Sequence, residues 1–398
     1  MVEQLDSNHL VQGWASSLES VFGKSRHASR CFFAPGRICL IGEHLDYNGG
    51  MVMPAAISRG IYGFIRKRDD KNVILKSSTQ PGVASFSLEK IEKQPDSSWF
   101  NYPLGVVKYM SNIGFHVGGF EMIFFSDLPT ASGLSSSAAI EVLTAFSIRE
   151  LFEGSELSLP NLAQLCMKVE NEFVGLPCGI MDQFASVMGK KSQAILLNCN
   201  NLAFEYVPFN TGEYRMIIVN TNKPRKLTES PFAQRKQDCL DALSMLQKKI
   251  PAKGLAQVSV EHIEKYITDP LLKKRALYFA EENGRVNESA EAMKKGDVYR
   301  FGEIMWKSHE GLQNKYEVTG LELDTIVDSA RKFEGCIGAR MTGAGFGGCA
   351  IALVHNSVVD QFKQYVKADY KQTVGIEPSF YETEIGNGVR ELEIEKSG

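Results

Sequence analysis

The sequence predicts an α+β fold in two domains. The chain has 398 residues, which is more than one hydrophobic core usually serves. Stretches typical of strands and stretches typical of amphipathic helices are both present, but they do not alternate regularly. Regular alternation is what parallel crossovers require, so a doubly wound parallel sheet is disfavoured. We expect a first domain over residues 1–205 and a second over residues 206–398.

Short apolar runs predict the strands. Such runs occupy residues 120–125, 194–197 and 215–219, and a further one occupies residues 349–354. Each run is too short for a typical helix and is rich in residues that favour a pleated, half-buried surface. We therefore expect strands over these stretches, the last of them late in the chain.

Helical spacing predicts the other elements. In residues 159–173, apolar side chains recur at helical intervals, after a capping candidate, Ser158, and a first-turn Pro160. From residue 230 to residue 333 the pattern is mainly helical, with lysine-rich faces that are typical of solvated surfaces. The second domain should accordingly be dominated by helices.

Composition limits the possible partners. The chain is 43% hydrophobic and 23% charged, with a formal net charge of -3, as in an ordinary globular protein. It offers no basic field for nucleic acid or an anionic membrane, so a small-molecule partner is favoured. Eight cysteines lack the paired spacing of a structural zinc site and are expected to be reduced thiols. Because the sequence shows no signal-peptide pattern and no apolar run of ~20 residues, we expect a cytoplasmic protein. We also expect a monomer or a weak homo-oligomer.

A serine-rich segment predicts a phosphate site. It follows a predicted strand and precedes an apolar helical run, and it comprises Gly133, Leu134, Ser135, Ser136, Ser137 and Ala138. Small residues let the backbone approach a ligand closely, and a helix that begins here would direct N–H groups and its positive end at an anion. The alternative is a serine helix cap in a tight turn. No Gly-Lys-Ser/Thr follows, so this is not a Walker A loop.

A glycine-rich turn over residues 342–348 satisfies G-x-G-x-x-G. A dinucleotide fingerprint needs a strand before it and a helix after it. Here we expect a helix, near residues 323–333, before the turn and the strand of residues 349–354 after it. The pattern therefore favours a backbone turn close to a ligand or another loop, and not a Rossmann site.

Two further segments crowd polar residues into short stretches. Glu43, His44 and Asp46 lie within a ten-residue stretch that begins at Arg37, and such groups could hold a polyol, belong to a surface loop or bind a metal. Asp182 lies among apolar neighbours, so its charge needs a partner such as Arg37.

Taken in order, these four segments resemble the galactokinase branch of the galactose, homoserine, mevalonate and phosphomevalonate (GHMP) kinase superfamily. The resemblance runs from about residue 33 to residue 385. Residues 36–48 look like the galactokinase signature, residues 133–138 like the phosphate loop, residues 178–184 like the segment with the catalytic aspartate and residues 342–348 like the third motif. The resemblance implies a GHMP-kinase-type fold with the active site in a cleft between two domains.

The resemblance also implies roles for residues. Arg37 and Asp182 would flank the anomeric hydroxyl of a monosaccharide, with Asp182 accepting its proton or orienting it. ATP would be the co-substrate and Mg²⁺ the cofactor. The sugar would be held by Glu43, His44, Asp46 and Gly179, the phosphates by the backbone of residues 133–139, the metal by Ser137 and Glu170, and the adenine by Trp99.

The chain departs from the family pattern at three positions. Cys39 and Leu45 replace the usual Asn and Thr, which should alter packing behind the sugar loop. Phe232 stands where the family has a sugar-contacting tyrosine, so one contact to a sugar hydroxyl is lost. Two alternatives therefore stay open beside galactose phosphorylation: another sugar-1-kinase, for galacturonate, N-acetylgalactosamine or arabinose, and a non-catalytic sugar sensor.

Overall fold

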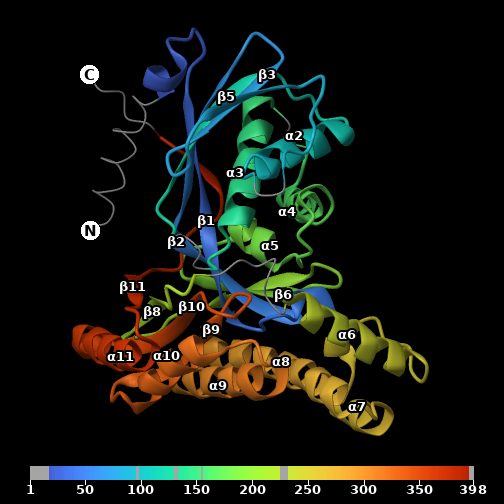
Figure 1. Ribbon diagram of the computed structural model, residues 1–398, viewed down its shortest axis with the longest axis vertical. Helices are drawn as coiled ribbons and strands as arrows, with labels where there is room; N and C mark the ends of the chain where they lie inside the picture. Colours follow the sequence, from blue (N-terminus) through green and yellow to red (C-terminus); the bar gives the residue numbers. More distant parts are fainter. Residues whose placement is uncertain (1–17, 96–97, 130–132, 154–155, 225–231, 394–398) are drawn as a thin grey trace.

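Two β-sheets with helices packed against each make up the structure, which is a computed structural model (Figure 1). It describes residues 18–95, 98–129, 133–153, 156–224 and 232–393. The largest buried apolar cluster includes residues from both sheets, so the two sheets and their helices share one continuous core.

The first sheet contains eight strands. They are β1 (Arg30–Ile41), β2 (Met51–Lys67), β3 (Asn72–Ser77), β4 (Val83–Ser87), β5 (Phe120–Ser126), β6 (Gln193–Asn198), β7 (Phe204–Pro208) and β12 (Arg390–Leu392). The main path runs β12-β1-β2-β5-β3-β4, and β6 and β7 extend it from β2. β3 and β5 are parallel, and the other pairs are antiparallel.

The register between the two longest strands, β1 and β2, shifts between Pro35 and Arg37 and again between Cys39 and Ile41. Such irregularities bend a strand and re-aim its side chains. They bracket Arg37, the first residue of the predicted site. The bends therefore lie where the sequence predicts chemistry.

The helices beside the first sheet are α2 (Asn101–Asn112), α3 (Ser136–Leu151), α4 (Leu159–Lys168) and α5 (Met181–Met188). Ser158 caps α4 as predicted, because its hydroxyl accepts a hydrogen bond from the Asn161 N–H. The helix predicted to reach residue 173 changes instead into a π-helix, η2 (Val169–Val174). Short π-helical turns of this kind often occur at functional sites.

The second sheet has the order β11-β8-β10-β9. Its strands are β8 (Tyr214–Asn220), β9 (Cys336–Thr342), β10 (Cys349–His355) and β11 (Ser379–Glu382). The accompanying helices are α6 (Phe232–Gln247), α7 (Val260–Tyr266), α8 (Pro270–Lys294), α9 (Val298–Gly311), α10 (Leu321–Lys332) and α11 (Val359–Val374), with short turns η1 (Asp46–Asn48), η4 (Leu255–Gln257), η5 (Leu312–Tyr316) and η6 (Asn356–Val358). α8 packs against β1, β2 and β7 and so joins this half of the molecule to the first sheet.

Most predicted elements are confirmed. The four apolar runs correspond to β5, β6, β8 and β10, and residues 230–333 are mainly helical where the structure describes them. All eight cysteines are present as thiols, as expected. No helix among the described residues combines the length and apolar character that a bilayer crossing requires.

One expectation about the glycine-rich turn was wrong. The element directly before it is β9, and not the predicted helix, which ends earlier as α10. β9 and β10 pair antiparallel on either side of the turn. Because a strand and not a helix follows, the turn is still no dinucleotide fingerprint.

The domain boundary after residue 205 stays a prediction. Residue 205 lies inside β7, which belongs to the first sheet. The chain also returns to that sheet near its end, where β12 pairs with β1.

Candidate active site

The predicted pairing of Arg37 with Asp182 is confirmed. Nε of Arg37 donates to Oδ1 of Asp182 at 2.7 Å, and Nη2 donates to Oδ2 at 2.6 Å. The remaining Nη1 donates to the carbonyl of Gly133 at 2.7 Å. Arg37 is 5% exposed and the side chain of Asp182 is 24% exposed, so the guanidinium end of this bidentate pair is the end shielded from solvent. Three of the four predicted segments thus meet around one guanidinium group.

Ser135 connects the phosphate loop to the same carboxylate. It precedes the first turn of α3 with a left-handed backbone (φ 60°), and its hydroxyl donates to Oδ2 of Asp182. Its side chain therefore does not cap α3, and the alternative interpretation of this segment as a serine cap is wrong. This side chain leaves the first-turn N–H groups and the positive end of α3 uncapped. An uncapped helix N-terminus is an arrangement that binds anions.

The other described residues of the loop differ in exposure. Leu134 and Ala138 are buried, Gly133 and Ser137 are half-buried, and Ser136 is exposed. Residues 130–132 lie outside the described part of the chain. The buried side chains of Leu134 and Ala138 therefore hold this segment in place, while part of the surface of residues 133–137 stays accessible.

Glu43 is a buried carboxylate at the meeting point of two motifs. Its Oε1 accepts a hydrogen bond from the Gly343 N–H at 2.7 Å and lies 3.7 Å from Nη1 of Arg340. Burial raises the pKa of Glu43 to about 7, although Arg340 and Arg37 act in the opposite direction. At 1% exposure Glu43 is not part of a surface loop, so that alternative is wrong for this residue.

His44 and Asp46 follow at the end of β1. His44 is buried with a left-handed backbone (φ 65°), and burial together with Arg340 lowers its pKa to about 3. Asp46 begins η1, and burial followed by the charge of Asp182 raises its pKa to about 6. A Cβ atom at Gly179 would lie 2.1 Å from Oδ2 of Asp46, so only glycine permits this approach. The structure thus brings Asp46, Gly179 and Asp182 together.

Glu170 lies in η2 and is 7% exposed. Its Oε2 accepts a hydrogen bond from Nε2 of Gln183 at 2.7 Å, and the Ser137 side chain also bonds to it. Burial, and next the charge of Asp182, raise the pKa of Glu170 to about 7. The two predicted metal ligands, Ser137 and Glu170, are therefore neighbours.

The glycine-rich turn contributes residues whose contacts the sequence did not reveal. A Cβ atom at Gly343 would lie 2.9 Å from the carbonyl oxygen of Gly133, while the Gly343 N–H serves Glu43. Arg340, which is fully buried in β9, donates to the carbonyl of Cys39 at 2.9 Å. The turn and the strand before it therefore contact both the serine-rich segment, at Gly133, and the segment of residues 36–48, at Cys39 and Glu43. An arginine just before the glycines is the one signal in the sequence that could have indicated this.

The contacts above do not test two predicted binding residues. Trp99 is half-buried, and its ring lies against Phe100, with centroids 4.2 Å apart, and against the edge of Phe124 in β5. Phe232 begins α6, and its side chain lies outside the part of the chain that the structure describes. Their contacts with adenine and sugar stay predictions.

The described residues do not build a metal site on their own. Among the residues that the structure describes, no group of three or more histidine, cysteine, aspartate or glutamate side chains could hold a metal ion. The interpretation of Glu43, His44 and Asp46 as a metal site therefore has no support in the geometry. An ion at Ser137 and Glu170 would need ligands from another molecule.

The arrangement suits the transfer of an anionic group to a hydroxyl. Ser135, at the N-terminus of α3, bonds to Asp182 of the bidentate Arg37–Asp182 pair. Two further carboxylates, the buried Glu43 and the half-buried Asp46, lie close enough to interact with the charges of this pair. The helix end and the guanidinium can stabilise negative charge, and the carboxylates can accept hydrogen bonds from hydroxyl groups.

Comparison with known proteins identifies the same segments. Family models match at residues 16–67 (galactokinase galactose-binding signature), 101–190 (GHMP kinases N terminal domain) and 289–372 (GHMP kinases C terminal). A galactokinase of Clostridium beijerinckii is 44% identical over 383 residues, which cover 94% of this chain and 98% of that protein. A galactokinase of Clostridium tetani is 46% identical over 366 residues, covering 91% and 93% of the two chains.

Solved structures agree in fold. The crystal structure of Lactococcus lactis galactokinase complexed with galactose matches with a TM-score of 0.93 and 42% identity, covering 96% of this chain and 100% of that one. Methanococcus jannaschii mevalonate kinase matches with a TM-score of 0.65 at 22% identity, covering 91% and 100%. The second likeness concerns the fold alone.

Proposed function

The chain belongs to the galactokinase family of GHMP kinases, and from this we propose that it transfers the γ-phosphoryl group of ATP to the anomeric hydroxyl of D-galactose. The products are galactose 1-phosphate and ADP. The observation that carries the proposal is the cluster of Arg37, Asp182 and Ser135 at the N-terminus of α3, where an acceptor for a hydroxyl proton lies beside a site for phosphate.

Asp182 and Arg37 act on the reacting hydroxyl. Asp182 accepts the proton of the anomeric hydroxyl or orients it, and Arg37 holds the carboxylate by two parallel hydrogen bonds. Phosphoryl transfer asks a protein mainly to align the reacting oxygens and to neutralise charge. Arg37 also fixes the Gly133 carbonyl, so one side chain sets the distance between the carboxylate and the phosphate loop.

Glu43, His44, Asp46 and Gly179 bind the sugar, with Phe232 bordering it. Glu43 is a buried carboxylate and Asp46 a half-buried one, and burial raises the pKa of both, so a hydroxyl group that donates to them relieves part of their desolvation. A site of this kind leaves its own polar groups unpaired when the matching hydroxyl is absent, which is how it selects among sugars.

Ser137 and Glu170 hold Mg²⁺. Both offer hard oxygen atoms, the preference of this ion, which usually takes one or two carboxylates and completes its shell with water and substrate phosphates. None of the ion pairs among the described residues involves Glu170, and its pKa is raised to about 7, so its charge is under-compensated within the chain. When bound, the ion would neutralise charge on the transferring phosphoryl group. Trp99 borders the adenine of ATP.

One assay across several sugars tests the proposal. ADP release should be fastest, as kcat/KM, with galactose, and slower with galacturonate, N-acetylgalactosamine or arabinose. Glu43 would place a carboxylate close to C6 of the sugar, where the like charge of a uronate is costly. Preference for another sugar would identify the chain as a different sugar-1-kinase, and galactose binding without ADP release would identify it as a sensor.

We also propose a cytoplasmic location and a monomer or weak homo-oligomer, with no nucleic-acid or membrane partner.

A further inference from the structure

Tyr316 is a fully buried tyrosine that lies next to the segment of residues 36–48. It ends η5, and its ring stacks on Tyr278 with centroids 5.2 Å apart and planes 9° from parallel. The edge of the His44 ring meets it with centroids 4.9 Å apart and an interplanar angle of 62°. Tyr316 therefore packs directly against one of the proposed sugar-binding residues.

The hydroxyl of Tyr316 belongs to a chain of hydrogen bonds that reaches His44. It lies 2.9 Å from the hydroxyl of Tyr47, and that hydroxyl lies 2.8 Å from Nδ1 of His44. On the other side, Sγ of Cys239 lies 3.5 Å from the Tyr316 hydroxyl. A hydroxyl in such a chain can donate to one neighbour only, so each member limits the direction of the next bond.

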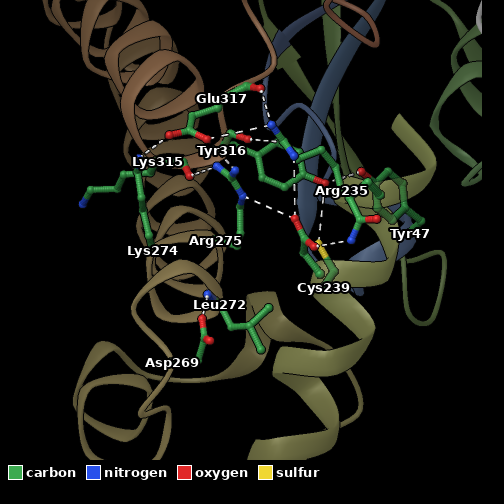
Figure 2. Close-up of polar contacts among 12 residues, drawn as sticks. Tyr47, Arg235, Cys239, Asp269, Leu272, Lys274, Arg275, Lys315, Tyr316 and Glu317 are labelled. Carbon is green, nitrogen blue, oxygen red and sulfur yellow. Dashed lines mark hydrogen bonds and ion pairs between the residues drawn. The ribbon is translucent and has the colours of Figure 1, made fainter. Parts of the chain in front are cut away.

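The main chain around Tyr316 is fixed by two arginines (Figure 2). Arg235 of α6 donates to the carbonyl of Tyr316 at 2.9 Å and to that of Glu317 at 3.2 Å. Arg275 of α8, with 1% of its side chain exposed, donates to the carbonyl of Lys315 and to the Glu317 carboxylate, the latter at 2.6 Å. Helix ends leave carbonyls without internal partners, and these guanidinium groups satisfy them. Tyr316 thus has little freedom to move.

We propose that Tyr316 is a positioning residue for the sugar site, which acts through Tyr47 to fix the ring orientation of His44 and the ring nitrogen that carries its proton. This proposal rests on the proposed role of His44 in binding the sugar. A neutral imidazole has one donor and one acceptor nitrogen, and the partner of Nδ1 decides which of the two Nε2 presents. The low pKa of His44, about 3, keeps the ring neutral at neutral pH.

Tyr316→Phe tests the proposal because it removes the hydroxyl and keeps the stacked ring. The loss of one hydrogen bond behind the site should weaken galactose binding by about three- to tenfold, measured as Kd by calorimetry and as KM. The kcat and the KM for ATP should change less than about twofold, since the proposed role of His44 is in binding the sugar and not in aligning the phosphoryl group. Tyr370→Phe is the matched control. It also removes a buried hydroxyl, which donates to Thr221 at 2.8 Å, and it should leave galactose affinity unchanged.

Two further measurements separate positioning from packing. In ¹⁵N spectra of histidine-labelled protein, with His44→Gln used to assign the signal, Tyr316→Phe should change the proton distribution between Nδ1 and Nε2 of His44. Tyr47→Phe should weaken galactose binding as Tyr316→Phe does, and the double variant should lose no more than either single one. If Tyr316→Phe lowers the Tm so far that it cannot be assayed, Tyr47→Phe decides.

The outcomes are distinct. Unchanged galactose Kd in Tyr316→Phe and Tyr47→Phe, or additive losses in the double variant, overturn the inference. If the unaltered chain binds galactose without phosphorylating it, the proposed function fails, and the Kd comparison still tests Tyr316. If it does not bind galactose, both fail, because the inference rests on that site.

Discussion

The carboxylate of Asp182 accepts three hydrogen bonds from two side chains, Arg37 and Ser135. The two donor residues lie in different parts of the fold, Arg37 in β1 and Ser135 at the start of α3. The hydrogen bonding of the carboxylate therefore depends on how these two elements are placed relative to each other. A charged pair with such complete hydrogen bonding is strong, and the loss of Asp182 would leave the buried charge of Arg37 without its partner.

Asp182→Asn should remove most turnover. An amide has one acceptor oxygen, and its NH₂ group would face an N–H of Arg37, so it can neither take a proton nor keep both bonds. We expect kcat to fall by about 10²–10⁴-fold, the usual contribution of general acid–base catalysis, while the KM for galactose changes a few-fold. Ser135→Ala, which removes one donor and keeps the Arg37 pair, should lower kcat much less. Near-normal turnover in Asp182→Asn would exclude the acid–base role.

Glu170→Ala should raise the Mg²⁺ requirement more than the KM for galactose. The shift in half-saturating Mg²⁺ should be at least about tenfold, since even side chains outside the ligand shell change metal affinity by about 10–100-fold. Glu172→Ala is the control, because Glu172 lies in the same π-helix but its side chain is 53% exposed. Activity is measured against Mg²⁺ at fixed ATP and against galactose at saturating Mg²⁺. Equal rises in both would show that Glu170 is only a structural residue.

At the scale of residues, the sequence predicted a contact that follows from the chemistry of the side chains. It missed contacts in which only the fold decides which distant residue becomes the partner. The partnership of Arg37 with Asp182 could be expected, because a carboxylate among apolar residues needs a cation. The bond from Gly343 to Glu43 spans 300 residues, and no local pattern indicates which backbone N–H will serve a buried carboxylate. The hydroxyl chain through Tyr316 is hidden for the same reason.

At the scale of elements, the sequence predicted those helices and strands that carry a clear local signal. The Ser158 cap and the strand β10 followed from capping chemistry and from an apolar run. β9 was missed because its sequence contains a glycine and a buried arginine, Arg340, and lacks both alternation and an uninterrupted apolar run. Nη1 of Arg340 contacts Cys39 and Glu43 in another part of the fold, and these contacts offset part of the cost of burying Arg340, which propensity rules cannot anticipate.

The end of η5 should contribute stability that depends on pH. Hydrogen bonds from Lys274 and then Arg275 lower the pKa of Glu317 from 4.5 to about 2. A depressed folded-state pKa means that the contribution is present above pH 4.5 and is lost as the pH falls toward 2. Glu317→Gln should therefore lower the Tm at pH 6 and lose this difference near pH 2. A difference in Tm that is constant over this range would show that the charge of Glu317 is not responsible.

At the scale of the whole molecule, the segment between β11 and β12 links the two sheets. After pairing with β8, the chain donates from the Gly386 N–H to Ala56 of β2 at 2.9 Å and from the Gly388 N–H to Gly189 at 2.7 Å. The Val389 N–H then donates to Ser186 of α5 at 2.9 Å, before β12 joins β1. Because α5 also carries Asp182, the last described part of the chain supports the helix on which the proposed catalysis depends.

Gly388→Ala should weaken that link. A Cβ atom at this buried position would lie 2.2 Å from the carbonyl oxygen of Val187, so the segment or the end of α5 must move. Overpacking of this kind costs about 1–3 kcal/mol, and we expect a lower Tm together with faster amide exchange at Gly388 and Val389. Gly284→Ala is the matched control. Gly284 is an exposed residue inside α8 where an added methyl group would meet open space, so alanine there should stabilise the protein by about 0.5–1 kcal/mol. If both substitutions raised the Tm, the close packing of this segment on α5 would be excluded as a support of the site.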